Sequence, residues 1–182
     1  MILWHMGIAV AIVYVTLGRR RIDYRFILLG AVVPDVIDTV LNVTVCHDPA
    51  GRSISHTLLA PIVVTVAILL FFRGERRIRV FGLGVGWLLH LVGDGMWQAP
   101  KTFLWPAFGT HFATQPPEPY SWDLLAHPLS HLSTWGGELV GLAILVWFAI
   151  AFDLFDRDRF RTFLKDGYLR PTEADRVHET TP

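Results

Sequence analysis

Six ionisable side chains lie within otherwise apolar stretches of this sequence, and their chemical types suit a metal site. They are His5, Asp35, Asp38, His56, His90 and Asp94. Imidazole and carboxylate groups together are typical ligands of zinc, manganese and iron(II). Ionisable groups are costly in an apolar environment, and this set would repel or stay unpaired without a cation. The six residues therefore predict a divalent-metal site, with zinc as the first choice, manganese or iron as alternatives, and one or two ions.

The spacing of these residues groups them further. Asp35 and Asp38, in "AVVPDVIDTV", are three apart, and His90 and Asp94, in "HLVGD", are four apart. Residues at these separations share a face of a helix. An acid pair at a helix end, marked by Pro34, is the alternative for the two aspartates, and a structural ion pair is the alternative for His90 and Asp94.

Chemistry beyond metal binding points to a few further side chains. Whichever of Asp35 and Asp38 does not bind the metal is a candidate base that takes a proton from water. Arg52, four residues before His56, is a candidate phosphate clamp because a guanidinium group binds phosphate oxygens through two donors. The alternative is an ordinary surface arginine.

Five apolar stretches must position these groups. They cover residues 2–18, 26–45, 55–72, 80–97 and 135–155. Each is close to the ~20 residues that a helix needs to cross a bilayer. The sequence therefore predicts an all-α, polytopic membrane protein with five transmembrane helices. Gly82, Gly84 and Gly86 are expected to allow close helix packing, not to bind phosphate.

The basic residues predict the orientation. All lysines and arginines except Arg52 and Lys101 follow the first, third and fifth apolar stretches, at 19–25, 73–79 and 157–176. Basic connections face the cytoplasm, so the N-terminus is expected outside and the C-terminus inside. The first stretch differs from a cleaved signal peptide because its positive charges come after the apolar residues.

Counting along the expected helices places the six polar residues at one level. At ~1.5 Å per residue from the nearest basic cluster, they lie about 15 to 26 Å from the cytoplasmic side. This range falls in the outer half of a ~30 Å hydrocarbon core. A single site opening toward the outer leaflet is therefore expected.

The connection at 98–134 is the longest and lies on the outer side. It is rich in proline and aromatic residues, which favours a packed cap, and it contains His127 and His131 one helical turn apart. These two histidines are candidates for extra metal ligands or acid–base groups, with His131 taken as the catalytic one, and an ordinary loop pair is the alternative. Glu138, seven residues after His131, could face it. The domain boundary is expected between a membrane domain at 1–155 and a charged cytoplasmic tail at 156–182, in which "RFRTFL" could form an interfacial helix.

The ordered motifs resemble a known family. A histidine near the N-terminus, then "PDVID", "RSISH" and "HLVGD", look like the YdjM-like inner-membrane proteins. The resemblance covers about residues 1–110 and implies a membrane-bound, metal-dependent hydrolase, with the six residues and Arg52 at the family's polar positions. It also implies LexA binding. The ligand order loosely resembles zinc phospholipase C and P1-type nucleases, which implies that Asp94 bridges two metals, although "HPLSH" and Glu138 depart from their downstream ligand spacing.

Together these features predict a function and its main alternative. We expect a prokaryotic inner-membrane hydrolase that cleaves an ester or phosphoester of a membrane lipid or polyprenyl-type substrate at the outer leaflet. A non-catalytic metal-binding, transport or partner-binding protein is the alternative. The formal net charge is zero, so no nucleic-acid partner is expected, and the single cysteine excludes a disulfide within the chain. The sequence leaves the oligomeric state open.

Overall fold

The computed structural model describes residues 1–18, 22–41, 44, 52–112 and 132–169. Within these ranges the regular structure is helical and contains no strand, which confirms the all-α prediction. The α-helices are Ile2–Leu17 (α1), Tyr24–Gly30 (α2), Val33–Leu41 (α3), Leu59–Phe71 (α4), Gly74–Gly93 (α5), Pro100–Phe103 (α6), Leu132–Ala151 (α8) and Arg157–Asp166 (α9). Two short 3-10 helices are Ile54–His56 (η2) and Met96–Gln98 (η3).

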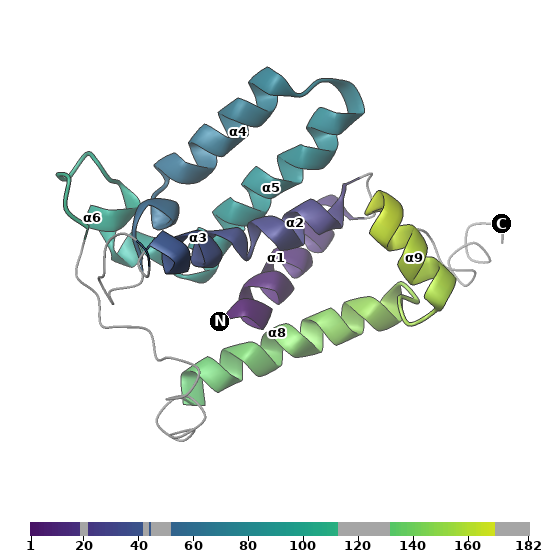
Figure 1. Cartoon of the computed structure of the whole chain (residues 1–182). Helices are drawn as coiled ribbons and strands as arrows, with labels where there is room; N and C mark the ends of the chain where they lie inside the picture. Colours follow the sequence, from purple (N-terminus) through teal and green to yellow (C-terminus); the bar gives the residue numbers. More distant parts are fainter. Residues whose placement is uncertain (19–21, 42–43, 45–51, 113–131, 170–182) are drawn as a thin grey trace.

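Two helix pairs form the centre of the bundle. Helix α1 packs along α8, and α2 packs along α5, while α4 and α5 form a hairpin at one side (Figure 1). The shared core contains small and aliphatic residues of α1 and α2 together with Phe148 near the end of α8. The pairs bring the start of α1, all of α3 and the end of α5 to the same end of the molecule.

Glycines permit the close approach within both pairs. A Cβ atom at Gly86 of α5 would overlap the carbonyl oxygen of Ile27 in α2. A Cβ atom at Gly7 of α1 would come 2.7 Å from the Cα of Gly141 in α8. The packing role expected for the glycines of α5 is therefore confirmed at Gly86.

The second apolar stretch is not one continuous helix. Helix α2 ends at Gly30 and α3 begins at Val33, so the expected single helix over 26–45 is wrong. Pro34 explains the break, because a proline ring collides with the carbonyl four residues earlier and supplies no N–H group. The break places Ala31 at the junction, where its carbonyl oxygen meets α5.

Two other expected boundaries also shift. In the third stretch α4 begins only at Leu59, and His56 lies in the preceding 3-10 helix. Arg52 and His56 therefore do not share an α-helical face. In the fourth stretch α5 starts earlier, at Gly74, and ends at Gly93, just before Asp94.

Part of the charged tail forms a helix that packs against the bundle. Helix α9 confirms a helix at "RFRTFL", and Phe163 and Leu169 are buried in the core that α1, α2 and α8 share. Asp23, which caps α2, binds the side chain of Arg25 through both carboxylate oxygens, at 2.9 and 2.6 Å. This hydrogen bonding raises the pKa of Arg25 above its ordinary value.

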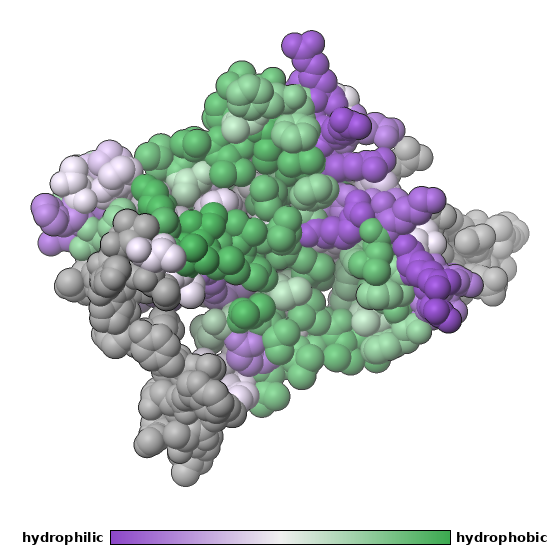
Figure 2. All heavy atoms as spheres, in the orientation of Figure 1, coloured by the Kyte–Doolittle hydropathy of each residue, from purple (hydrophilic) through white to green (hydrophobic). Residues whose placement is uncertain are grey.

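One helix among the described residues is long and apolar enough to cross a membrane. It is the Thr134–Ala151 part of α8, whereas the apolar helices Ile2–Leu17 and Leu59–Phe71 are shorter. Figure 2 shows hydrophobic residues in a broad band across the molecule and strongly hydrophilic residues gathered at the end that carries α9.

Candidate metal centre

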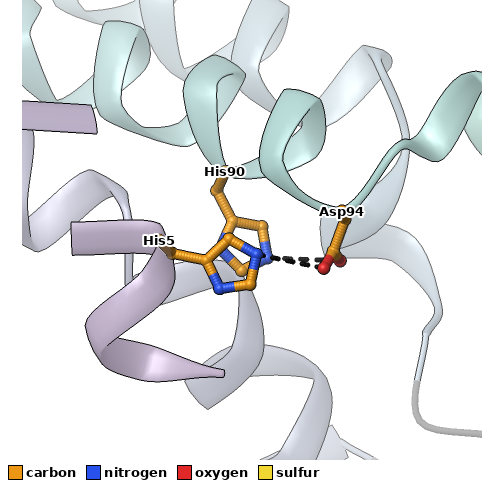
Figure 3. Close-up of side chains that lie close together, drawn as sticks. All are labelled: His5, His90 and Asp94. Carbon is orange, nitrogen blue, oxygen red and sulfur yellow. Dashed lines mark hydrogen bonds and ion pairs between the residues drawn. The ribbon is translucent and has the colours of Figure 1, made fainter. Parts of the chain in front are cut away.

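All six polar residues predicted from the sequence meet at one end of the bundle. His5 comes from α1, Asp35 and Asp38 from α3, His56 from η2, and His90 and Asp94 from the end of α5. Figure 3 shows His5 and His90 pointing toward Asp94. The rings of His5 and His90 stack with their centres 4.1 Å apart.

The hydrogen bond of His90 fixes which ring nitrogen is available. Its Nδ1 lies 2.8 Å from the carbonyl oxygen of Ala31, at the α2–α3 break. A carbonyl can only accept, so Nδ1 carries the proton. In the neutral ring, Nε2 then presents its lone pair toward the other site residues.

His56 has the same arrangement with a carboxylate partner. Its Nδ1 lies 2.7 Å from Oδ2 of Asp38. An ionised carboxylate only accepts, so Nδ1 again donates and Nε2 keeps a lone pair in the neutral ring. A histidine whose second nitrogen donates to a carboxylate or carbonyl is the usual arrangement of a metal ligand.

The two available nitrogens face each other. Nε2 of His56 and Nε2 of His90 are 3.2 Å apart, with Oδ1 of Asp35 3.4 Å from each. Oδ2 of Asp94 lies 3.2 Å from His56 Nε2 and 3.7 Å from His90 Nε2. Within the described structure this buried oxygen has no hydrogen-bond partner. Two lone pairs and two carboxylate oxygens converge on one point, which favours a cation there.

Asp38 lies on the far side of the His56 ring from that point. It accepts hydrogen bonds from the Ser53 N–H at 2.5 Å, the Ser53 hydroxyl at 2.8 Å and the Ser55 N–H at 3.1 Å. With His56 Nδ1 it therefore has four donors, and it is fully buried. These contacts satisfy the Asp38 carboxylate and hold the His56 ring in place.

Two supporting contacts have no direct signal in the sequence. The Trp87 indole donates to the carbonyl oxygen of Ser55 at 2.8 Å, and the Ser55 hydroxyl donates to the carbonyl of Pro34 at 2.7 Å. The serines of "RSISH" are the feature that could have indicated them. The role of the Ala31 carbonyl depends on the α2–α3 break and is visible only in the fold.

The second oxygen of Asp94 faces a different pair of residues. Its Oδ1 lies 3.0 Å from Nε2 of His5 and 3.1 Å from Nη2 of Arg52. Nδ1 of His5 in turn lies 2.5 Å from the carbonyl oxygen of Met1. Asp94 thus contacts the paired nitrogens of His56 and His90 with one oxygen and the side chains of His5 and Arg52 with the other.

Most side chains of the site are buried, and two are partly exposed. His5, Asp38, His56 and His90 are at most 2% exposed and Asp94 is 4% exposed, whereas Asp35 is 34% and Arg52 20% exposed. Asp35 and Arg52 are therefore the most solvent-accessible of these side chains.

The remaining candidates from the sequence lie elsewhere. Glu138 accepts a hydrogen bond from the Leu3 N–H at 2.9 Å, so its carboxylate caps the start of α1 and does not face the paired imidazoles. His127 and His131 lie outside the described residues, so the catalytic role expected for His131 stays a prediction.

Two overlapping sets of side chains could hold an ion. They are His5, His90 and Asp94 on one side, and Asp35, His56 and His90 on the other, and in each set the ligand atoms lie within 4.8 Å of one another. The centre therefore supports the prediction of a metal site made of histidine and aspartate side chains.

Comparison with known proteins agrees with this arrangement. No curated protein and no solved structure gave a significant match. The family model described as YdjM inner membrane protein matches residues 1–160, which include every element of the metal centre. The chain therefore belongs to the YdjM inner membrane protein family.

Proposed function

We propose that this protein is a divalent-metal-dependent hydrolase of the inner membrane that cleaves an ester or phosphoester bond in a lipid-like substrate. The proposal rests mainly on the 3.2 Å separation of the Nε2 atoms of His56 and His90. Because both Nδ1 atoms donate to acceptors, neither ring in its neutral form has a proton on Nε2 to donate to the other. A cation between the rings removes the repulsion between their lone pairs.

Four side chains would hold the ion. They are Asp35, His56, His90 and Asp94, in which the two Nε2 atoms lie 3.2 Å from each other and 3.2 to 3.7 Å from the carboxylate oxygens. Ligand atoms about 2.05 Å from a tetrahedral zinc are about 3.3 Å apart. The spacing thus supports a single zinc ion, and the mixed nitrogen and oxygen donors suit manganese or iron(II) as alternatives.

The two aspartates of α3 would have different tasks. Asp38 orients His56 from behind and has no access to solvent, so it would act as a positioning residue. Asp35 faces the paired nitrogens and reaches the opening, so it can both contact the ion and accept a proton from an attacking water.

The chemistry follows from these placements. A divalent ion at this position would supply Lewis acidity and lower the pKa of a bound water toward ~7. Arg52, beside Asp94 at the opening, would neutralise the charge that develops on a phosphate group of the substrate. The buried walls formed by His5, Asp38 and Trp87 would exclude bulk water.

The surroundings of the opening support a lipid-like substrate. Asp35 lies on α3 beside Val36 and Val40, which are 53% and 54% exposed. A headgroup at Asp35 would thus sit next to an apolar surface that can contact an acyl or isoprenoid chain.

Five membrane crossings are part of the proposal. The α2–α3 pair would form one broken crossing, and α1, α4, α5 and α8 the others. A broken helix at membrane depth is tolerated where the break faces a protein interior, as the Ala31 carbonyl does by binding His90. The basic residues then face the cytoplasm, and the metal centre faces the outer leaflet.

The direct test is turnover by the purified protein. Detergent-purified wild type with added zinc or manganese would be incubated with a panel of phospholipids and polyprenyl phosphates. We expect release of a water-soluble product by the wild type and by Asp153→Asn, a control at an exposed aspartate near the opposite end. We expect Asp35→Asn to reduce turnover by at least about 100-fold, as the loss of a general base does. Equal turnover by Asp35→Asn and wild type would refute the role of Asp35, and no turnover of any ester would refute the hydrolase.

A further inference from the structure

Helix α9 is a preformed element with defined ends. The side chain of Asp156 accepts hydrogen bonds from the N–H groups of Asp158 and Arg159, and Gly167 ends the helix in a left-handed conformation with φ 75°. Such caps stabilise a short helix without any partner. Its surface therefore has a fixed geometry before anything binds to it.

One face of α9 is attached to the bundle. Phe163 is buried in the core, and Nη1 of Arg25 donates to the carbonyl oxygen of Leu164 at 2.6 Å. The N–H of Tyr24 donates to the carbonyl oxygen of Gly167 at 2.9 Å. These contacts fix α9 against the start of α2.

The exposed surface of α9 carries an apolar row beside the attached face and then a basic row on the far side. Phe160 and Leu164, four residues apart, are 44% and 53% exposed. Arg157, Arg161 and Lys165 are also four residues apart and exposed, so they form a parallel row. Asp158 is the one exposed acidic residue within this face of α9. Adjacent apolar and basic rows are typical of helices that lie in a membrane interface.

The position of α9 places this face at the edge of the apolar band. Helix α9 follows the apolar span of α8 after a short turn and runs across the end of that helix (Figure 1). Figure 2 shows that hydrophilic residues begin at this end of the molecule. An exposed face here meets lipid headgroups, not bulk hydrocarbon.

We propose that the exposed face of α9 is a docking surface for anionic phospholipid headgroups in the adjoining leaflet. Phe160 and Leu164 enter the boundary between headgroups and acyl chains, and Arg157, Arg161 and Lys165 contact the lipid phosphates. This surface lies at the opposite end of the molecule from the metal centre, and the proposal is independent of the hydrolase activity.

Hydrogen exchange in defined bilayers tests the proposal. The full chain would be placed in nanodiscs of phosphatidylcholine alone or with added phosphatidylglycerol, and amide exchange would be followed over residues 157–166. We expect exchange about tenfold slower with phosphatidylglycerol, because each basic residue near an anionic surface contributes favourably. Raising the salt to about 1 M should remove the difference, since the screening length falls to about 3 Å.

Two triple variants test whether the effect comes from α9 itself or from the overall positive charge at this end of the molecule. The first variant, with Arg157→Gln, Arg161→Gln and Lys165→Gln, should lose the slowing of exchange by phosphatidylglycerol. A control variant with Arg73→Gln, Arg76→Gln and Arg77→Gln removes the same charge from the α4–α5 connection and the first turn of α5. This variant should keep the slowing by phosphatidylglycerol. Identical exchange of the wild type in both lipids, or equal slowing in the α9 variant, would overturn the proposal. Slowing by soluble glycerol phosphate in neutral nanodiscs would also overturn it, because it would indicate a site for a free anion.

Discussion

The two imidazole rings at the centre of the site are each held by an acceptor behind them. The Ala31 carbonyl holds His90, and the Asp38 carboxylate holds His56. Each acceptor places the proton on Nδ1 and turns Nε2 inward. The chemical character of the site thus depends on groups that do not themselves reach its centre.

Asp38→Asn tests this dependence at one residue. The amide matches the carboxylate in size but is a weaker acceptor for His56 and for the Ser53 and Ser55 donors. We expect about 10- to 100-fold weaker zinc binding, the usual effect of losing a supporting carboxylate. Competition with a chromogenic chelator measures the affinity, with Asp153→Asn as the control. Wild-type affinity in Asp38→Asn would contradict the assigned role.

His5 and His56 contact different oxygens of Asp94. Its Nε2 meets the Asp94 oxygen on the Arg52 side, whereas His56 Nε2 meets the paired centre. We expect His5→Gln to retain most of the bound metal and His56→Gln to lose it, as judged by metal-to-protein ratio. Equal loss in both variants would make His5 a ligand and favour the two-ion alternative.

Much of this site was predictable from residue types and spacing. The six polar residues stand out because each interrupts an apolar stretch at a similar distance along the chain from a basic cluster, and the structure brings all six together. The different surroundings of Asp35 and Asp38 were not predictable, since both lie on the same face of α3. They differ through Ser53 and Ser55, which reach Asp38 from a segment 15 and 17 residues later.

At the scale of elements, the packing of α2 against α5 positions the metal centre. Gly30 and Gly86 let the two helices approach closely enough for the Ala31 carbonyl to reach His90. The stretch "GLGVG" predicted close packing, but not its partner, because the partner depends on tertiary contacts. The break at Pro34 was visible in the sequence only as an alternative to a continuous span.

Gly86→Ala tests the importance of this contact. The added methyl group would overlap the Ile27 carbonyl, which is backbone and cannot turn aside, so the helices must separate. We expect a loss of about 1–3 kcal/mol in the free energy of unfolding, as for other overpacked cores, together with weaker metal binding. Thermal unfolding in detergent measures the first effect.

The control for that variant is Gly136→Ala on α8. An added Cβ there meets no atom within 4 Å, and alanine favours the helix. We expect unchanged or slightly higher stability with normal metal binding. Comparable destabilisation in both variants would show that the effect of Gly86→Ala does not come from the α2–α5 contact.

At the scale of the whole molecule, the two ends of the bundle differ in the residues they carry. The basic connections and α9 gather at one end, and the metal centre lies at the other, with an apolar band between them. The gathering of basic residues at one end was predictable because charge bias needs no tertiary information, and the membrane orientation drawn from it stays a prediction. The helix lengths were not predictable, because η2 and the start of α5 depend on local packing.

Reporter fusions test the proposed topology. A green fluorescent protein fused after residue 169 should fluoresce, and alkaline phosphatase at the same point should be inactive, because this end is expected in the cytoplasm. Fusions of both reporters within the 98–134 connection should give the reverse pattern. Active alkaline phosphatase at the C-terminal fusion would contradict five crossings with an outer N-terminus.

The central claim is that the facing nitrogens of His56 and His90 hold a divalent ion. The most direct measurement is elemental analysis of the full chain purified in detergent without added metal, for wild type, His56→Gln and His111→Gln. His111 is an exposed histidine and serves as the control. The account predicts about one divalent transition-metal ion per chain in the wild type and His111→Gln, and almost none in His56→Gln. A wild type that binds no metal even after zinc is supplied, or His56→Gln with the wild-type metal content, would contradict it.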